Sequence, residues 1–174
     1  ACTGNTKVGS KGRTVIRVAM KDFYRLEVAE ALWTLADRGC LVDVIYDEPA
    51  DVAPYLDQSD AVVAALTRPL TGTGGKVRLF LAGDRTAEQP KRRLVHSKYL
   101  LIEGKFADHE NSKVVFTGSH NFSYGSLRHN DETLLRVSSA RHVSSLPIPH
   151  ARRPPAAMTP WAATGPATTN PDSR

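Results

Sequence analysis

The sequence predicts an α/β protein with a mixed β-sheet flanked by helices. Short runs rich in β-branched residues alternate with longer stretches of helical periodicity over most of the chain. Near the N-terminus a strand, a helix and a second strand follow one another directly, which is typical of a parallel βαβ unit. The 174 residues, 41% of them hydrophobic and 24% charged, suit one folded domain around a single core.

The βαβ unit begins with the alternating run Thr14–Met20, which predicts a strand. Asp22 is a candidate N-cap for a helix that extends to about Arg38, because apolar residues recur there at intervals of three and four. Gly39 can supply the left-handed position after that helix. The run Cys40–Tyr46 then predicts a second, mostly buried strand, parallel to the first and next to it.

The rest of the predicted domain contains one more helix of ordinary length, several strands and one short helix. The segment Asp51–Leu66 has helical length. Strands are predicted at Lys76–Leu81, Leu94–Ile102, Lys113–Thr117 and Thr133–Val137, with a short helix over Phe122–Arg128.

The chain divides by composition into three parts: an N-terminal strand or linker (1–13), a folded domain (14–137) and a tail (138–174). Seven of the eleven prolines lie in the tail, between Ala, Ser and Thr, so we expect the tail to be disordered. Residues 1–137 carry 19 Lys and Arg against 17 Asp and Glu, although the whole chain has a net charge of +5. The folded part therefore lacks the concentrated positive charge typical of nucleic-acid-binding proteins.

The sequence contains no apolar stretch near the roughly 20 residues that a transmembrane helix needs. Its two cysteines, Cys2 and Cys40, allow at most one disulfide, and the sequence alone does not show whether they meet. We expect them to stay apart, with Cys2 in a frayed terminus and Cys40 buried.

The residues that indicate chemistry lie between positions 94 and 137. His96 and Lys98 are two residues apart on or just before a predicted strand, so both side chains are expected to point into one cleft. The next strand ends in Gly118-Ser119-His120-Asn121, where a small residue lets a ligand approach the backbone and a hydroxyl and an amide offer hydrogen bonds. A third strand starts near Asn130-Asp131-Glu132.

This set of groups suits the binding of a phosphate diester and an attack on its phosphorus atom. Lys98 can neutralise the non-bridging oxygens, while Ser119 and Asn121 donate hydrogen bonds to them. Glu132 can accept the Nδ1 proton of His96, which leaves Nε2 free as the nucleophile. The scheme needs no metal ion and no cofactor.

The ordered combination of His96-x-Lys98, Gly118-Ser119-x-Asn121 and Asn130-Asp131-Glu132 before an apolar strand resembles the HKD motif of the phospholipase D superfamily. The N-terminal βαβ segment is similar to the start of the same domain, so the resemblance covers about residues 14–137. It implies a phosphohistidine intermediate on His96 with Lys98 and Asn121 as phosphate ligands, and it extends to Gly118, Ser119 and Glu132 as further site residues. The fold it implies is a phospholipase D-like half-domain.

The chain departs from this motif in two places. The motif's aspartate corresponds to Glu103, and 14 residues rather than the usual six separate that position from Gly118. In the family the acid looks structural, so Glu103 is expected to be tolerated. The additional residues, which include Asp108-His109-Glu110, are expected to form a protruding, solvated loop rather than a metal site.

One HKD motif is not sufficient for the implied reaction. In-line displacement places the nucleophile and the leaving oxygen on opposite sides of phosphorus, so a second imidazole must protonate the departing alcohol. His120 would point away from the cleft on an extended segment, and we interpret it as structural or as part of the rim. The second motif is expected from a two-fold homodimer or from a motif-bearing segment that preceded Ala1.

Three functions remain open from the sequence. The first is a phospholipase D-type phosphodiesterase that hydrolyses a phospholipid or transfers its phosphatidyl group to another alcohol. The second is a sequence-nonspecific endonuclease that acts as a homodimer, and the third is an inactive fragment that only binds phosphate. Secretion is expected from the similarity to extracellular members and from the Ala- and Pro-rich composition.

Overall fold

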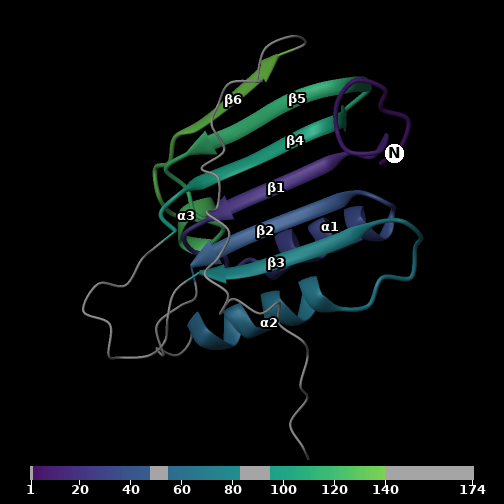
Figure 1. Cartoon of the computed structure of the whole chain (residues 1–174). Helices are drawn as coiled ribbons and strands as arrows, with labels where there is room; N and C mark the ends of the chain where they lie inside the picture. Colours follow the sequence, from purple (N-terminus) through teal and green to yellow (C-terminus); the bar gives the residue numbers. More distant parts are fainter. Residues whose placement is uncertain (1, 48–54, 83–94, 140–174) are drawn as a thin grey trace, which may run out of the picture.

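The computed structural model describes residues 2–47, 55–82 and 95–139, which form one mixed sheet with helices beside it (Figure 1). Within these residues the sheet has six strands in the order β3-β2-β1-β4-β5-β6. The elements in chain order are β1 (Val15–Met20), α1 (Leu26–Asp37), β2 (Leu41–Asp47), α2 (Tyr55–Thr67), β3 (Lys76–Ala82), β4 (Lys98–Phe106), β5 (His109–Gly118), α3 (Tyr124–Arg128) and β6 (Leu134–Ser139). The predicted α/β class with a mixed sheet is confirmed.

The sheet combines a parallel half and an antiparallel half. Strands β1, β2 and β3 are parallel neighbours, as the βαβ pattern predicts. Strand β4 pairs antiparallel with β1 and continues into the antiparallel β5 and β6. The carboxyl ends of β1 to β3 therefore share one edge of the sheet with the start of β4 and the end of β5, and α3 lies at the same edge (Figure 1).

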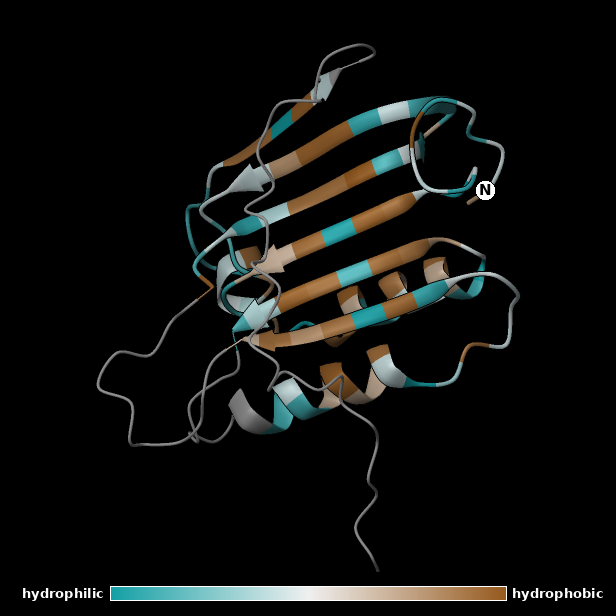
Figure 2. Ribbon diagram, in the orientation of Figure 1, coloured by the Kyte–Doolittle hydropathy of each residue, from teal (hydrophilic) through white to brown (hydrophobic). Residues whose placement is uncertain are grey.

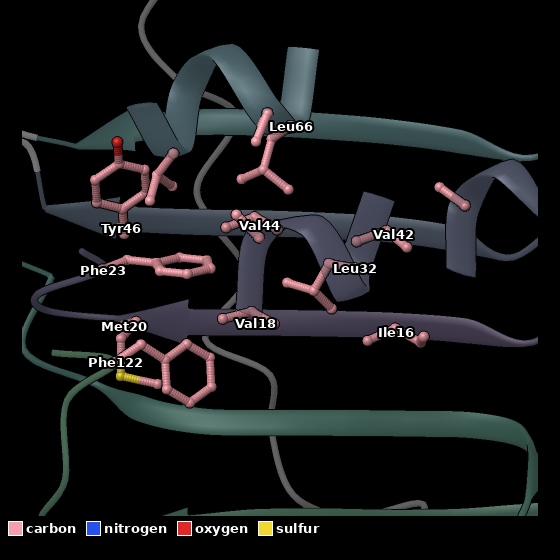
Figure 3. Close-up of a cluster of buried hydrophobic side chains, with 14 of the residues drawn as sticks. Ile16, Val18, Met20, Phe23, Leu32, Val42, Val44, Tyr46, Leu66 and Phe122 are labelled. Atoms are coloured by element: carbon pink, nitrogen blue, oxygen red, sulfur yellow. The ribbon is translucent and has the colours of Figure 1, made fainter. Parts of the chain in front are cut away.

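The hydrophobic core lies between the parallel half of the sheet and the helices α1 and α2. Alternate residues of β1 and β2 point toward the helices, as expected from the period of two in a strand. Figure 3 shows this cluster, which includes Ile16, Val18, Met20, Phe23, Leu32, Val42, Val44, Tyr46, Leu66 and Phe122. Met20, Phe23 and Tyr46 are fully buried, and each such burial stabilises the fold by about 1.5–3 kcal/mol.

The opposite face of the sheet carries a row of charges across four strands. Arg78 pairs with Asp43 at 2.6 Å, Asp43 lies 3.8 Å from Arg17, and Arg17 pairs with Glu103 at 2.8 Å. Figure 2 shows hydrophilic bands in the middle of β1 and β2 between hydrophobic segments. Glu103, the residue at the position of the motif's aspartate, thus has a structural ion pair. It lies on β4 within this row.

Helix α1 starts later than predicted. Its N-cap is Arg25, which makes no side-chain capping hydrogen bond, and the prediction of Asp22 as the cap is wrong. The Asp22 side chain instead accepts a hydrogen bond from the side-chain amide of Asn121, which is 99 residues away in the sequence. At the other end, Gly39 adopts the predicted left-handed conformation with φ +99°, and its amide donates to the carbonyl of Ala36.

The residues between Glu103 and Gly118 do not form the expected loop. They lengthen β4 and β5 into a hairpin in which Phe106 pairs with His109, so the turn is only two residues long. Gly104 is required within this hairpin, because its φ is +140° and an added Cβ would meet Thr14. Sequence periodicity missed the extension because Gly104 and a register shift interrupt the alternation there.

The N-terminal segment packs against the start of β1 and the far end of this hairpin. The side chain of Asn111 accepts hydrogen bonds from the backbone amides of Thr6 and Lys7 at 2.9 and 2.8 Å. Cys2 is buried and forms a disulfide with Cys40, with a Cα–Cα distance of 4.8 Å. The expectation that the two cysteines stay apart is therefore wrong, because long-range packing of the N-terminal segment brings Cys2 to the start of β2.

The disulfide leads to the first prediction. Replacement of Cys2 and Cys40 by serine should lower the free energy of unfolding by roughly 4 kcal/mol, since the bond closes a loop of 38 residues in the unfolded chain. Thermal unfolding followed by circular dichroism, with and without reductant, measures this loss. An unchanged melting temperature in reductant would contradict it. Activity at saturating substrate should not change, because Cys40 lies at the amino end of β2, away from the edge described below.

Several predicted features lie outside the described residues. They are the tail from residue 140, the start of the second helix before Tyr55, and Leu94. The strand predicted from Leu94 begins only at Lys98, since residues 95–97 are described and are not part of a strand. The division into three parts thus stays a prediction. Among the described residues, no helix is long and apolar enough to cross a bilayer.

Candidate active site

A cleft of about 520 Å³ opens at the sheet edge where β1 ends, β4 begins and β5 ends. Its lining combines residues that are far apart in the sequence: Lys21, His96, Lys98, Gly118, Ser119 and Asn121. All of these except Lys21 were predicted from the sequence as site residues. The predicted convergence of His96, Lys98 and Asn121 on one cleft is therefore present in the structure.

His96 and Lys98 enter the cleft from the start of β4. Lys98 is the first residue of that strand and is paired in register with Met20, the last residue of β1. Its backbone carbonyl accepts a hydrogen bond from the Thr117 hydroxyl at 3.0 Å, and its ammonium group lies 3.4 Å from the carbonyl of His96. His96 is exposed, and among the described residues no hydrogen bond to its imidazole is found. His96 also lines the cleft, where its imidazole can contact a ligand.

Gly118 ends β5, and Ser119 is the first residue after that strand. An added Cβ at Gly118 would collide with the carbonyl oxygen of Thr133. The glycine therefore lets the start of β6 come close to β5, whereas the sequence predicted that it lets a ligand come close to the backbone. The backbone amide of Ser119 donates to the Thr133 carbonyl at 3.1 Å, and the Ser119 hydroxyl accepts from the Thr133 amide at 3.0 Å. Ser119 is therefore fixed at the cleft by β6.

Glu132 holds Ser119 from the other side. One of its carboxylate oxygens accepts the Ser119 hydroxyl, and the other accepts from the Asn130 amide at 3.2 Å. These hydrogen bonds, that of Ser119 first, lower the pKa of Glu132, so the carboxylate is ionised at neutral pH. Within the described part of the chain, no hydrogen bond joins Glu132 to His96, and the observed contact of Glu132 is with Ser119.

Lys21 and Asp22 are the site residues that the sequence did not identify. The ammonium group of Lys21 lies 3.0 and 3.1 Å from the two carboxylate oxygens of Asp22. Asp22 in turn accepts a hydrogen bond from the side-chain amide of Asn121 at 2.8 Å. Their position directly after a parallel strand is a signal that could have found them, because ligands in α/β sheets bind at the carboxyl ends of strands.

His120 lies apart from these groups. It does not line the cleft, its buried Nδ1 atom has no hydrogen-bond partner within residues 2–47, 55–82 and 95–139, and its ring lies 6.1 Å from that of Phe122. This placement agrees with a structural interpretation of His120. Among the described residues no group of three or more His, Cys, Asp or Glu side chains could hold a metal ion, and this includes Asp108-His109-Glu110.

The cleft combines two ammonium groups, an amide, a hydroxyl and an exposed imidazole. Ammonium and amide groups stabilise the negative charge on phosphate oxygens, and an imidazole can attack phosphorus. A phosphate diester is thus the ligand class that fits the lining.

Comparison with known proteins identifies the family of this domain. The family model described as "Cardiolipin synthase, PLD-like domain" matches residues 10–147. NucT from Helicobacter pylori is a similar solved structure with 24% identity and a TM-score of 0.49, and the match covers 72% of this chain and 69% of that one. A second is the phospholipase D family member Nuc from Salmonella typhimurium, with 17% identity, a TM-score of 0.45 and coverage of 75% and 78%. No curated protein matches the chain.

Proposed function

Because the chain belongs to the phospholipase D superfamily of phosphodiesterases, we propose that it cleaves a phosphodiester bond through a covalent phosphohistidine intermediate on His96. The observation that supports this most is the single cleft that His96 and Lys98 share with Ser119 and Asn121. These side chains come from two separate segments, so their convergence depends on the tertiary fold and not on sequence proximity.

In the first step, Nε2 of His96 attacks phosphorus and the bond from phosphorus to the leaving oxygen breaks. The charge that builds on the non-bridging oxygens is stabilised by the ammonium group of Lys98 and by an N–H of Asn121. The Ser119 hydroxyl donates its proton to Glu132 and accepts from the Thr133 amide, so Ser119 lines the cleft without a free proton for these oxygens. In the second step water attacks the phosphohistidine, and His96 becomes the leaving group.

The proposed reaction needs a second imidazole opposite His96. It protonates the departing alcohol in the first step and takes a proton from water in the second. Its source is a second copy of this chain in a two-fold homodimer or another motif-bearing segment. His96, which would face the second imidazole, is exposed and lines the cleft.

We propose a phospholipid as the substrate. The nearly neutral charge of residues 1–137 and the family model's description as a cardiolipin synthase domain support this choice. The second candidate is a sequence-nonspecific endonuclease. It is favoured by Lys21, which adds a second ammonium group to the cleft beside Lys98 and suits a polyanionic backbone.

Secretion is part of the same proposal. The Cys2–Cys40 disulfide supports it, because disulfides persist in oxidising, extracellular environments and are rare in reducing ones.

Parallel assays on two substrates separate the candidates. Phosphatidylcholine vesicles are assayed for choline release, and plasmid DNA in EDTA is assayed for nicking, each with the wild-type chain and the H96N variant. Lipid hydrolysis alone supports the first candidate, and DNA cleavage alone supports the second. If neither substrate is cleaved and the chain is monomeric by light scattering, the third possibility, an inactive phosphate-binding fragment, is supported and the proposed function is wrong.

A further inference from the structure

We propose that Asp22 is a positioning residue for the reaction, and that it fixes the side-chain amide of Asn121 so that one N–H points into the cleft. This inference rests on the proposed function, because it assigns the effect of Asp22 to phosphodiester cleavage. It concerns a residue outside the motif segment 96–132, on the loop that follows β1.

The contact between Asp22 and Asn121 has two points. The carboxylate oxygen Oδ2 of Asp22 accepts from Nδ2 of Asn121 at 2.8 Å, and the backbone amide of Asp22 lies 3.3 Å from Oδ1 of Asn121. Only one orientation of the amide satisfies both points, because the flipped amide would place two oxygens together and two N–H groups together. One Nδ2 proton is used by Asp22, and in the part of the chain that the structure describes no acceptor is found for the other, which a ligand in the cleft can take.

The negative charge of Asp22 is balanced so that it does not repel a phosphate. Lys21 lies 3.0 Å from its Oδ1 atom, and the Tyr24 hydroxyl donates to the same oxygen at 3.4 Å. Burial first, and then the Asp22 carboxylate, raise the pKa of Tyr24, so this hydroxyl remains a donor at every pH of interest. The Asp22 carboxylate thus accepts hydrogen bonds from three side chains.

The backbone around Asp22 is held independently of its side chain. The carbonyl of Asp22 accepts from the Phe122 amide at 3.0 Å, and the Phe122 carbonyl accepts from Tyr24 and Arg25 at 2.8 and 3.0 Å. The rings of Phe23 and Phe122 pack edge to face with centroids 5.2 Å apart, and both are buried in the core. Replacement of the carboxylate should therefore change the amide's orientation and leave this junction folded.

A double-mutant cycle tests the inference, with bis(p-nitrophenyl) phosphate as a substrate that does not depend on lipid or DNA recognition. D22N should lower kcat by about 10- to 100-fold, because a misplaced donor loses its stabilisation of the transition state. N121A should lower kcat by about 100-fold or more. In the N121A background, D22N should cost less than about 3-fold, because the route from Asp22 through the Asn121 amide has been removed.

The matched control is D43N. Asp43 is also ion-paired, and its side chain is 17% exposed against 21% for Asp22, but it belongs to the charge row on the opposite face of the sheet. It should keep the wild-type kcat. Full additivity of D22N and N121A, or a wild-type kcat for D22N, would overturn the inference. A D22N variant with a lower melting temperature and a wild-type kcat would overturn it as well, because the role of Asp22 would then be structural.

A second measurement separates failure of this inference from failure of the proposed function. If the wild-type chain does not cleave the substrate, inorganic phosphate is titrated while the side-chain amide signals of Asn121 are followed by NMR. Phosphate should shift these signals in the wild type, and D22N should weaken the affinity by about 10-fold. Equal affinity in both proteins, or no response in the wild type, would overturn the inference.

Discussion

The H96N variant should lose turnover by a factor on the order of 10⁴ to 10⁶, as expected when a covalent nucleophile is removed. The imidazole is exposed at the cleft, and no hydrogen bond to it is found among the described residues, so the fold should not depend on it. The melting temperature should remain that of the wild type. Initial rates at saturating bis(p-nitrophenyl) phosphate, together with thermal unfolding, measure both quantities.

The chain offers a matched control for this substitution. His109 is also exposed, and it lies at the turn of the β4–β5 hairpin, at the opposite end of β5 from Gly118. The same change there, H109N, should leave the rate unaltered. An H96N variant that retains a rate within a few-fold of the wild type would exclude His96 as the nucleophile.

The K98A variant should lower kcat by about 10²- to 10³-fold, which corresponds to about 2.7–4 kcal/mol of transition-state stabilisation. The ammonium group lies in the cleft, and charge on the phosphate oxygens grows in the transition state, so the loss should fall mainly on kcat. Separate determination of kcat and KM checks this division.

Lys105 provides the control for Lys98, since it lies on the same strand, near the other end of β4. K105A should keep both constants. If K98A raised KM and left kcat unchanged, Lys98 would bind substrate and transition state equally, and its assigned role would be wrong.

Local sequence patterns were sufficient for the parallel half of the sheet. The β1-α1-β2 unit follows from alternation in Val15–Met20, from three- and four-residue repeats in α1, and from the left-handed Gly39. The motif residues were also predictable, because the spacing of His96 and Lys98 and the end of β5 at Gly118 are local features. Functional residues that lie within one short segment can therefore be predicted from the sequence alone.

The features that the sequence did not predict depend on contacts between distant segments. Asp22 looks like a helix cap from its neighbours alone, and only the approach of Asn121, 99 residues later, gives it a different partner. The Cys2–Cys40 disulfide needs the N-terminal segment to fold back over the start of β2. Glu132 was expected to accept a hydrogen bond from His96, but it accepts one from the Ser119 hydroxyl instead. The reason is that the segment before β6 pairs with the end of β5, where the Thr133 amide also donates to Ser119.

The most direct test of the central claim is to identify the residue that carries phosphorus during turnover. The chain is mixed with bis(p-nitrophenyl) phosphate and quenched in alkaline denaturant, which preserves phosphohistidine, and its peptides are analysed by mass spectrometry. We predict a p-nitrophenyl phosphate adduct on His96 that is absent from H96N. An adduct on another residue, or steady turnover without any adduct, would contradict the account.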